Sequence, residues 1–245
     1  MQRRCDKGPS AIMCQSARRD RHVQEGDKRP CRPHVVKSVC QESVSTMSII
    51  RSVCVYCGSS NYVDEVYKQA AKETGHLLAS AGLDIIYGGG RVGLMGIVAD
   101  AALALGGRVV GIIPDHIQKF EVDHTGLTEL HVVDSMHTRK RMMVERSDAF
   151  VVLPGGIGTL DEMFEIITWR QLQLHDKPVI IVNTNGFWDP LIALLDHMQD
   201  TGFMRKPNLP GASQQLYHIV GNVEDILPML ALQPAPRQEV ETERL

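Results

Sequence analysis

Glycine-rich turns follow three apolar runs of this sequence, and each turn leads toward a segment of helical length. They span residues 57–60 (CGSS), 88–96 (GGGRVGLMG) and 154–159 (PGGIGT). Glycine lets the backbone approach a ligand closely, and the unpaired N–H groups at the start of a helix bind anions. Phosphate is therefore the ligand that these turns favour. The alternative is that the glycines only make tight turns, which three such turns on one rim of a fold render less attractive.

Three carboxylates follow the third turn: Asp161, Glu162 and Glu165. One role for them is structural, because Thr159 and Glu162 have the spacing of a capping box, and acids stabilise a helix N-terminus by about 0.3 to 1 kcal/mol. A cap alone needs fewer acids. Carboxylates aimed at a bound phosphate would repel it, so we expect them to face an uncharged or cationic part of the ligand. A sugar that develops positive charge is one candidate.

Arg139 and Lys140 supply the opposite charge, on a predicted helix that begins just after a strand. That position suits contact with a phosphate or a polarised base. The alternative is an ordinary solvated face, the usual role of a cationic run. His131 and His137 have no ligand-like partners, so we expect ordinary packing or solvation for both.

Gly88, Gly90 and Gly93 match the GxGxxG pattern of dinucleotide-binding proteins. In that class the pattern follows the first strand, and an acidic residue stands about 20 positions further on, at the end of the next strand. Here the pattern follows the second strand, and Asp115 lies beyond a proline. The chain also lacks the Gly-Lys-Ser/Thr of a P-loop. The pattern thus disfavours nicotinamide, flavin and P-loop chemistry.

The elements that must position these residues alternate along the chain from Met47 onward. Apolar runs bounded by Gly, Pro or polar residues predict strands, at 53–57, 83–87, 108–113, 130–133, 149–153 and 178–182. Helix-length segments lie at 63–81, 93–105, 136–147, 159–174 and 187–201. Strands that are apolar on both faces and joined by helices predict an α/β fold, a Rossmann-like three-layer sandwich with a mainly parallel sheet. Ligands of such sheets bind beyond the carboxyl ends of the strands, where the three turns lie.

Length and composition fit one globular domain. The chain has 245 residues, of which 43% are hydrophobic and 22% charged, and its net charge is −3. This charge argues against a nucleic-acid partner or a membrane surface, and no apolar run approaches the roughly 18 residues of a membrane span. Residues 1–46 hold 10 Lys and Arg against 5 Asp and Glu and show no helical or strand period. We expect a disordered extension at 1–46, one Rossmann-like domain at 47–232 and a flexible tail at 233–245.

The six cysteines do not predict a metal site. Four of them lie before residue 46, and Cys54 and Cys57 lack the second CxxC pair that a zinc site requires. Their odd separation within a strand points the two side chains to opposite faces. We expect buried free thiols, no bound metal and a cytoplasmic location. The N-terminal segment also lacks the apolar stretch of a secretory signal.

Taken together, these motifs resemble those of the LOG (Lonely Guy) family of cytokinin riboside 5′-monophosphate phosphoribohydrolases. The family's PGGxGTxxE motif corresponds to residues 154–162. The resemblance extends through residues 57–60, 87–96, 136–140 and 167–172, and it covers about residues 50–205. Members are often labelled lysine decarboxylases, but this sequence offers no argument for a pyridoxal phosphate lysine.

The resemblance implies hydrolysis of the N-glycosidic bond of a nucleoside 5′-monophosphate, which gives an adenine-type base and ribose 5-phosphate. It implies no cofactor, and a homodimer whose site is completed across the interface. By motif, Arg139 and Glu162 are the implied catalytic pair. The implied substrate contacts are Ser59, Gly89, Gly90, Glu121, Lys140, Gly155, Gly156, Ile157, Gly158, Thr159, Leu160, Asp161 and Thr168.

The chemistry of this reaction agrees with those roles. Cleavage of an N-glycoside passes through a cationic sugar, so a carboxylate such as Glu162 stabilises the developing charge or orients water. Arg139 stays protonated and acts electrostatically on the departing base or the phosphate. Two other classes stay open: a nucleotide or cofactor carrier would bind without releasing base, and an oxidoreductase would transfer hydride. The motifs leave open whether the base is prenylated adenine or adenine.

Overall fold

The computed structural model describes residues 50–118, 124, 126–204, 215–234 and 236. These residues all belong to one compact unit, Ser45–Leu245. The expectations for residues 1–46 and for most of 233–245 lie outside the described residues, and so does Glu121.

Seven parallel strands form a single sheet in the described part of the chain, in the order β4-β3-β2-β1-β5-β6-β7. The strands are β1 (Ser52–Tyr56), β2 (Asp84–Tyr87), β3 (Val109–Pro114), β4 (Glu129–Val133), β5 (Ala149–Val152), β6 (Val179–Val182) and β7 (His218–Val220). β1 lies in the middle, where Val53 pairs with Ile85 on one side and with Ala149 on the other. The predicted α/β fold with a parallel sheet is therefore confirmed.

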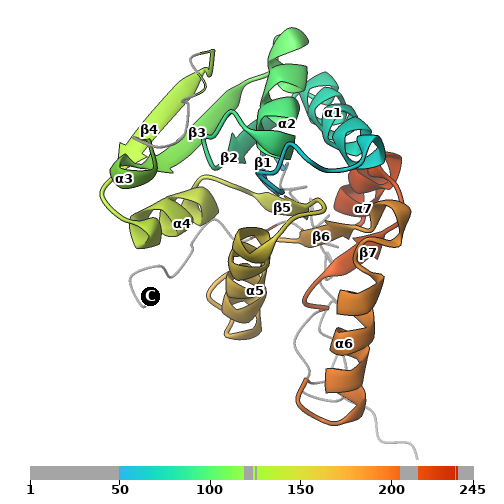
Figure 1. Ribbon diagram of the computed structural model, residues 1–245. Helices are drawn as coiled ribbons and strands as arrows, with labels where there is room; N and C mark the ends of the chain where they lie inside the picture. Colours follow the sequence, from blue (N-terminus) through green and yellow to red (C-terminus); the bar gives the residue numbers. More distant parts are fainter. Residues whose placement is uncertain (1–49, 119–123, 125, 205–214, 235, 237–245) are drawn as a thin grey trace, which may run out of the picture. The chain divides into compact units, whose positions relative to one another are not determined.

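Helices cover both faces of this sheet (Figure 1). They are α1 (Glu65–Ser80), α2 (Gly93–Ala104), α3 (Asp115–Gln118), α4 (Met136–Glu145), α5 (Ile157–Gln171), α6 (Asp189–Asp200) and α7 (Ile226–Ala231), with 3₁₀ turns η1 (Thr184–Gly186) and η2 (Val223–Asp225). Residues of α1, α2 and α7 share one buried cluster with one face, and residues of α4, α5 and α6 share another with the opposite face. Cys54 belongs to the second cluster and Cys57 to the first, and both are free thiols, as predicted.

The path of the chain creates a ligand position between β1 and β5. From β1 the chain adds β2, β3 and β4 outward on one side, then returns to place β5 on the other side of β1. The loops that leave two such strands diverge, which opens a crevice at their carboxyl ends. Gly58, just after β1, donates its N–H to the carbonyl of Pro154, just after β5, at 3.1 Å. Two of the predicted glycine-rich turns thus meet at this point.

The helix that follows the third turn differs from its prediction. α5 begins at Ile157 rather than Thr159, and its N-cap residue is Gly156, which offers no side-chain cap. Thr159 lies inside the first turn, is 4% exposed and packs against Gly155. The capping-box prediction is wrong, because the helix already begins within the glycine turn. Glu162 therefore lies in the second turn, where helix capping does not account for it.

The remaining differences concern short elements. The sequence prediction missed α3, α7 and the edge strand β7, each of them six residues or shorter. None of the helices in the described part of the chain has both the length and the hydropathy of a membrane-spanning segment.

Candidate active site

A cavity of about 290 Å³ lies at the carboxyl edge of the sheet, where the strand order reverses. Segments far apart in the sequence line it: the turns after β1, β2 and β5, and the helices α2 to α5. The lining residues are Cys57, Gly58, Ser59, Gly88, Met95, Ile117, Arg139, Gly156, Ile157, Gly158, Thr159 and Glu162. Of the predicted site residues, the structure brings together Ser59, Arg139, Glu162 and the stretch from Gly156 to Thr159.

Arg139 and Glu162 form an ion pair inside this cavity. Nη1 of Arg139 lies 3.3 Å from Oε1 of Glu162, and the two side chains are only 12% and 11% exposed. Nε of Arg139 donates to the carbonyl of Ile112 at 3.1 Å, which ties the guanidinium to the end of β3. Arg139 lies in the first turns of α4. The N-cap residue of this helix is Ser135, whose Oγ accepts a hydrogen bond from the N–H of Thr138 at 3.1 Å. The pair is therefore held from two helices and one strand.

Burial raises the pKa of the Glu162 carboxyl above its ordinary value, while the charge of Arg139 opposes this rise. A carboxylate that is poorly hydrated interacts more strongly with a neighbouring cation than one in water does. Ionised Glu162 is thus suited to stabilise positive charge on a group that enters the cavity.

The start of α5 lines the cavity and has the features of an anion-binding site. The first N–H groups of a helix lack carbonyl partners within it, and the first intrahelical bond here runs from the N–H of Leu160 to Gly156. A Cβ added at Gly156 or Gly158 would meet no atom within 4 Å, and neither residue has a positive φ. The fold itself therefore does not require glycine at these two positions, whereas a ligand that approaches the backbone closely does.

At the second turn, the first two amides of the following helix are already paired. The N–H of Gly93 at the start of α2 donates to Oδ1 of Asn61 at 2.8 Å, and that of Leu94 donates to the carbonyl of Gly58 at 2.9 Å. The turn at 57–60 is separated from α1, which begins at Glu65. Of the three glycine-rich turns, the one at the start of α5 therefore keeps the features of an anion site, and Ser59 from the turn after β1 lines the same cavity.

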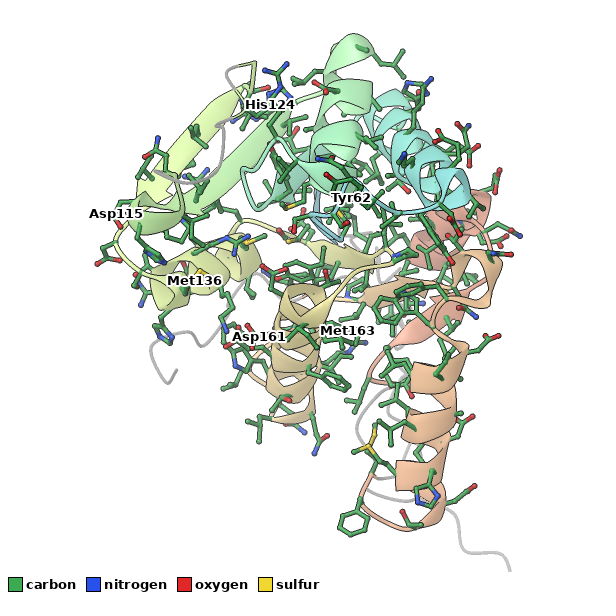
Figure 2. All side chains as sticks on the ribbon, viewed as in Figure 1. Tyr62, Asp115, His124, Met136, Asp161 and Met163 are labelled. Atoms are coloured by element: carbon green, nitrogen blue, oxygen red, sulfur yellow. The ribbon has the colours of Figure 1, made fainter. Side chains whose placement is uncertain are left out.

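Lys140 points away from the cavity toward two carboxylates of α5. Its Nζ lies 3.2 Å from Oδ2 of Asp161 and 3.0 Å from Oε1 of Glu165. In Figure 2 Asp161 lies on the side of α5 that faces α4. Arg139 and Lys140 are adjacent in sequence, but Arg139 lines the cavity and Lys140 pairs with Asp161 and Glu165 outside it.

Three more predicted contacts lie on a second, shallower depression along α5. Leu160, Asp161 and Thr168 line it rather than the cavity, and its volume is about 380 Å³. The complete lining is Ile157, Leu160, Asp161, Phe164, Glu165, Thr168 and Trp169. We call this depression the α5 groove. Ile157 belongs to both hollows, so the groove adjoins the cavity.

Three predicted glycines lie outside the cavity lining. Gly89 has a φ of +79°, and a Cβ there would lie 3.1 Å from that of Ile113, so it packs against β3. Neither Gly89 nor Gly90 lines the cavity, and nor does Gly155, which packs against Thr159.

Sequence reasoning missed five lining residues as site residues: Cys57, Gly58, Gly88, Met95 and Ile117. Four of them lie within predicted glycine-rich turns, which was a usable signal. Ile117 gave none, because α3 is a single turn of helix. Burial raises the pKa of the Cys57 thiol well above its ordinary range, so it stays protonated and is a poor nucleophile.

Comparison with known proteins shows the family of this chain. A family model described as "Possible lysine decarboxylase" matches residues 95–230. A cytokinin riboside 5′-monophosphate phosphoribohydrolase from Arabidopsis thaliana is 39% identical over 191 residues, covering 74% of this chain and 90% of the relative. A protein of the same name from Rhodococcoides fascians is 47% identical over 155 residues, covering 63% and 78%. A probable one from Oryza sativa subsp. japonica is 46% identical over 162 residues, covering 66% of each chain.

Solved structures support the fold. The molybdenum cofactor binding protein from Rippkaea orientalis superimposes with a TM-score of 0.55 at 21% identity, covering 74% of this chain and 96% of that one. The molybdenum cofactor carrier protein from Chlamydomonas reinhardtii gives 0.56 at 18% identity, covering 76% and 100%. At such identities the likeness shows a shared fold alone. The family model and the sequence relatives, in contrast, show that this chain belongs to the LOG family of cytokinin riboside 5′-monophosphate phosphoribohydrolases.

Proposed function

We propose that this protein hydrolyses the N-glycosidic bond of adenosine 5′-monophosphates, prenylated or plain, to the free base and ribose 5-phosphate. The observation that carries the proposal is the buried pair of Arg139 and Glu162 in the same cavity as the open N-terminal amides of α5. The amides can bind the 5′-phosphate of the substrate, and the charged pair can act on its N-glycosidic bond. Its sequence relatives carry the name of this activity.

In this mechanism the phosphate binds first to the N–H groups of Ile157, Gly158 and Thr159, with the hydroxyl of Ser59 beside it. This anchoring positions the ribose against Glu162, because binding energy from a remote group orients the reacting centre. Ionised Glu162 stabilises the positive charge on the ribose or orients the attacking water. The bond from C1′ to the base nitrogen breaks, water supplies oxygen to C1′, and a proton from water ends on the base. Arg139 stays charged throughout and stabilises the electrons that leave with the base.

We further propose a homodimer, cytoplasmic in location, in which a second copy of the chain covers the α5 groove. Ile157, in the first turn of α5, is 82% exposed, and Leu172, the C-cap residue of the same helix, is 62% exposed, and exposed large apolar side chains of this kind mark interaction surfaces. Thr168, Leu160 and Asp161 would then reach the partner's substrate rather than that of their own cavity. Sedimentation velocity tests this, and we expect a dimer that Leu172→Lys weakens. A wild-type monomer at micromolar concentration contradicts it.

The function is tested by chromatography of the products. The full chain is incubated with AMP, isopentenyladenosine 5′-monophosphate and the two free nucleosides, in buffer with a chelator and no cofactor. We expect free base and ribose 5-phosphate in equal amounts, with kcat/KM for a monophosphate at least about 100-fold above that for its nucleoside. Equal rates for nucleosides would contradict the phosphate site. Stoichiometric nucleotide binding without base release would contradict catalysis and support a carrier.

A further inference from the structure

Lys177 is a buried lysine that lies outside the cavity, just before β6. It is only 4% exposed, and its Nζ donates to the carbonyl of Val144, in the last turn of α4, at 2.7 Å. Lysine is almost never fully buried in a protein unless its ammonium has a partner. The partner here is the end of the helix that carries Arg139, one residue of the pair in the cavity.

The segment that contains Lys177 is fastened to α5, the helix that carries Glu162. Arg170, in the last turn of α5, donates from Nη1 to the carbonyl of Lys177 at 2.7 Å. His175 donates from Nε2 to the carbonyl of Ile166 in α5 at 2.8 Å, and its Nδ1 accepts from the N–H of Lys177 at 3.1 Å. Lys177 is therefore joined to α5 by its main chain and to α4 by its side chain.

The ammonium of Lys177 suits the end of α4 electrostatically. The last carbonyls of a helix have no N–H partner within it and form the negative end of its dipole, so a cation stabilises them. Burial lowers the pKa of Lys177, and the charges of Asp148 and Asp176 oppose this decrease. An apolar side chain of similar length would fill the same space without the cost of burying a charge. The contact that the ammonium makes is therefore the reason for a lysine at this position.

The position of α4 matters because Arg139 lies on it, five residues before Val144. A helix rises about 1.5 Å per residue, so only about 7.5 Å of helix separates the two residues. α4 and α5 pack on the same face of the sheet (Figure 1), and Nη1 of Arg139 lies 3.3 Å from Oε1 of Glu162. A slide or rotation of α4 against α5 would therefore change the geometry of the pair directly.

We propose that Lys177 is a positioning residue for the catalytic pair: by joining the end of α4 to the segment fastened to α5, it sets where Arg139 lies relative to Glu162. Lys177 does not line the cavity, so it acts through Arg139 and not on the substrate. This inference rests on the proposed function, in which that pair acts on the N-glycosidic bond.

The experiment compares kcat and KM of Lys177→Met with those of the wild type, using the full chain and a nucleoside 5′-monophosphate. Methionine fills the space of the lysine, and the carbonyl of Val144 still accepts from the N–H of Ser147 at 3.3 Å, so the variant should fold. We expect kcat to fall by roughly 10- to 100-fold, the scale of a catalytic group misplaced by about 1 Å. KM should change less than about threefold, because the phosphate binds to amides of α5 and not of α4.

Thr74→Val is the matched control. Thr74 is fully buried, and its Oγ1 donates to the carbonyl of Ala70 at 2.8 Å within α1, which packs on the other face of the sheet. Like Lys177→Met, the change removes a buried hydrogen bond from a side chain to a helix carbonyl. We expect Thr74→Val to keep the wild-type kcat. An equal loss of kcat in both variants would show a general effect of lost stability and would overturn the proposal.

A double-mutant cycle shows whether Lys177 acts through Arg139. In a chain that already carries Arg139→Ala, adding Lys177→Met should lower kcat by less than about twofold, because the residue to be positioned is gone. If the second change lowers kcat by the same factor as it does in the wild type, the two residues are independent and the inference is wrong.

NMR separates the failure of this inference from the failure of the proposed function. The Nε–H of Arg139, which donates to the carbonyl of Ile112, gives a nitrogen-15 signal in arginine-labelled chain that Arg139→Lys assigns. We expect this signal to shift in Lys177→Met and to stay in place in Thr74→Val, even if the chain releases no base. If Lys177→Met does not fold, Lys177→Arg takes its place, because its longer side chain should displace α4 and shift the same signal. An unmoved signal in the folded variant overturns the inference.

Discussion

The guanidinium of Arg139 lies directly against Gly88, where the Cβ of any larger residue would overlap Nη2. Two further contacts fix the arginine in this position: its Nε donates to the carbonyl of Ile112, and its Nη1 pairs with Glu162. Gly88, which the sequence analysis noted only as part of the GxGxxG pattern, thus leaves the space that the Arg139 side chain occupies.

Gly88→Ala should therefore displace Arg139 while the sheet stays folded. We expect kcat/KM to fall by roughly 10- to 100-fold, the scale of a catalytic group misplaced by about 1 Å, with a small change in melting temperature. Gly221→Ala is the matched control, since a Cβ there meets no atom within 4 Å. Wild-type turnover in Gly88→Ala would show that the position of Arg139 does not matter.

Gly158→Ala tests the proposed anion site at the start of α5, because it should raise the stability of the chain and weaken the binding of substrate. Gly158 is the second residue of α5, and a Cβ there meets no protein atom. Alanine in a helix is more stable than glycine by about 0.5 to 1 kcal/mol, so Gly158→Ala should melt slightly higher than the wild type. We expect KM for the monophosphate to rise at least tenfold in steady-state assays, because the methyl group blocks the approach of phosphate. An unchanged KM would show that the phosphate does not bind at the start of α5.

His175 should make stability depend on pH. It is 5% exposed, its Nδ1 accepts from the N–H of Lys177 at 3.1 Å, and its Nε2–H donates to the carbonyl of Ile166 at 2.8 Å, which fixes a neutral ring. Burial lowers its pKa to about 4. The unfolded chain then binds the proton more tightly, so stability is full above about pH 6.5 and falls as the pH drops toward 4.

Urea unfolding at pH 7.5 and pH 5 measures this loss. We expect about 2 kcal/mol of it to come from His175 and to vanish in His175→Gln. The exposed His116, changed to Gln, serves as the control. If the loss is the same in His175→Gln as in the wild type, protonation of this ring is not its cause.

Residues 1–46 should be dispensable. The buried residues of both clusters lie between Val53 and Leu230, among the described residues. The composition of residues 1–46 does not predict a hydrophobic core of their own. We expect a chain that begins at Met47 to match the full chain in melting temperature by calorimetry and in turnover. A large loss of melting temperature or turnover would show that residues 1–46 contribute to folding or catalysis.

The sequence predicted the sheet well for a physical reason. Strands of a parallel sheet are buried on both faces, so β1, β2, β3, β5 and β6 appear as continuous apolar runs. β7 is an edge strand of three residues that begins with a histidine, and α7 contains Pro228, so neither has a clear period. The start of α5 was misplaced because glycine carries little signal for a helix N-terminus that lacks a side-chain cap.

The site was predictable in its parts but not in its pairings. The motifs singled out Arg139 and Glu162, which the structure joins. They could not show that Lys140, one residue further on, turns about 100° around the helix to meet Asp161 and Glu165. Nor could they show that Asn61 and Gly58 occupy the amides at the start of α2. Such partners depend on how elements pack, which residue spacing within one element does not contain.

The most direct test of the whole account is base release by Glu162→Gln. The change keeps the size of the side chain and an acceptor for Arg139 but removes the charge that the mechanism places beside the ribose. With isopentenyladenosine 5′-monophosphate at saturation, we predict that kcat falls by roughly 100-fold or more while the melting temperature stays within a few degrees of the wild type. Glu145→Gln, at the exposed end of α4, should keep wild-type turnover. If Glu162→Gln folds normally and releases base at the wild-type rate, Glu162 is not the catalytic carboxylate and the account is wrong.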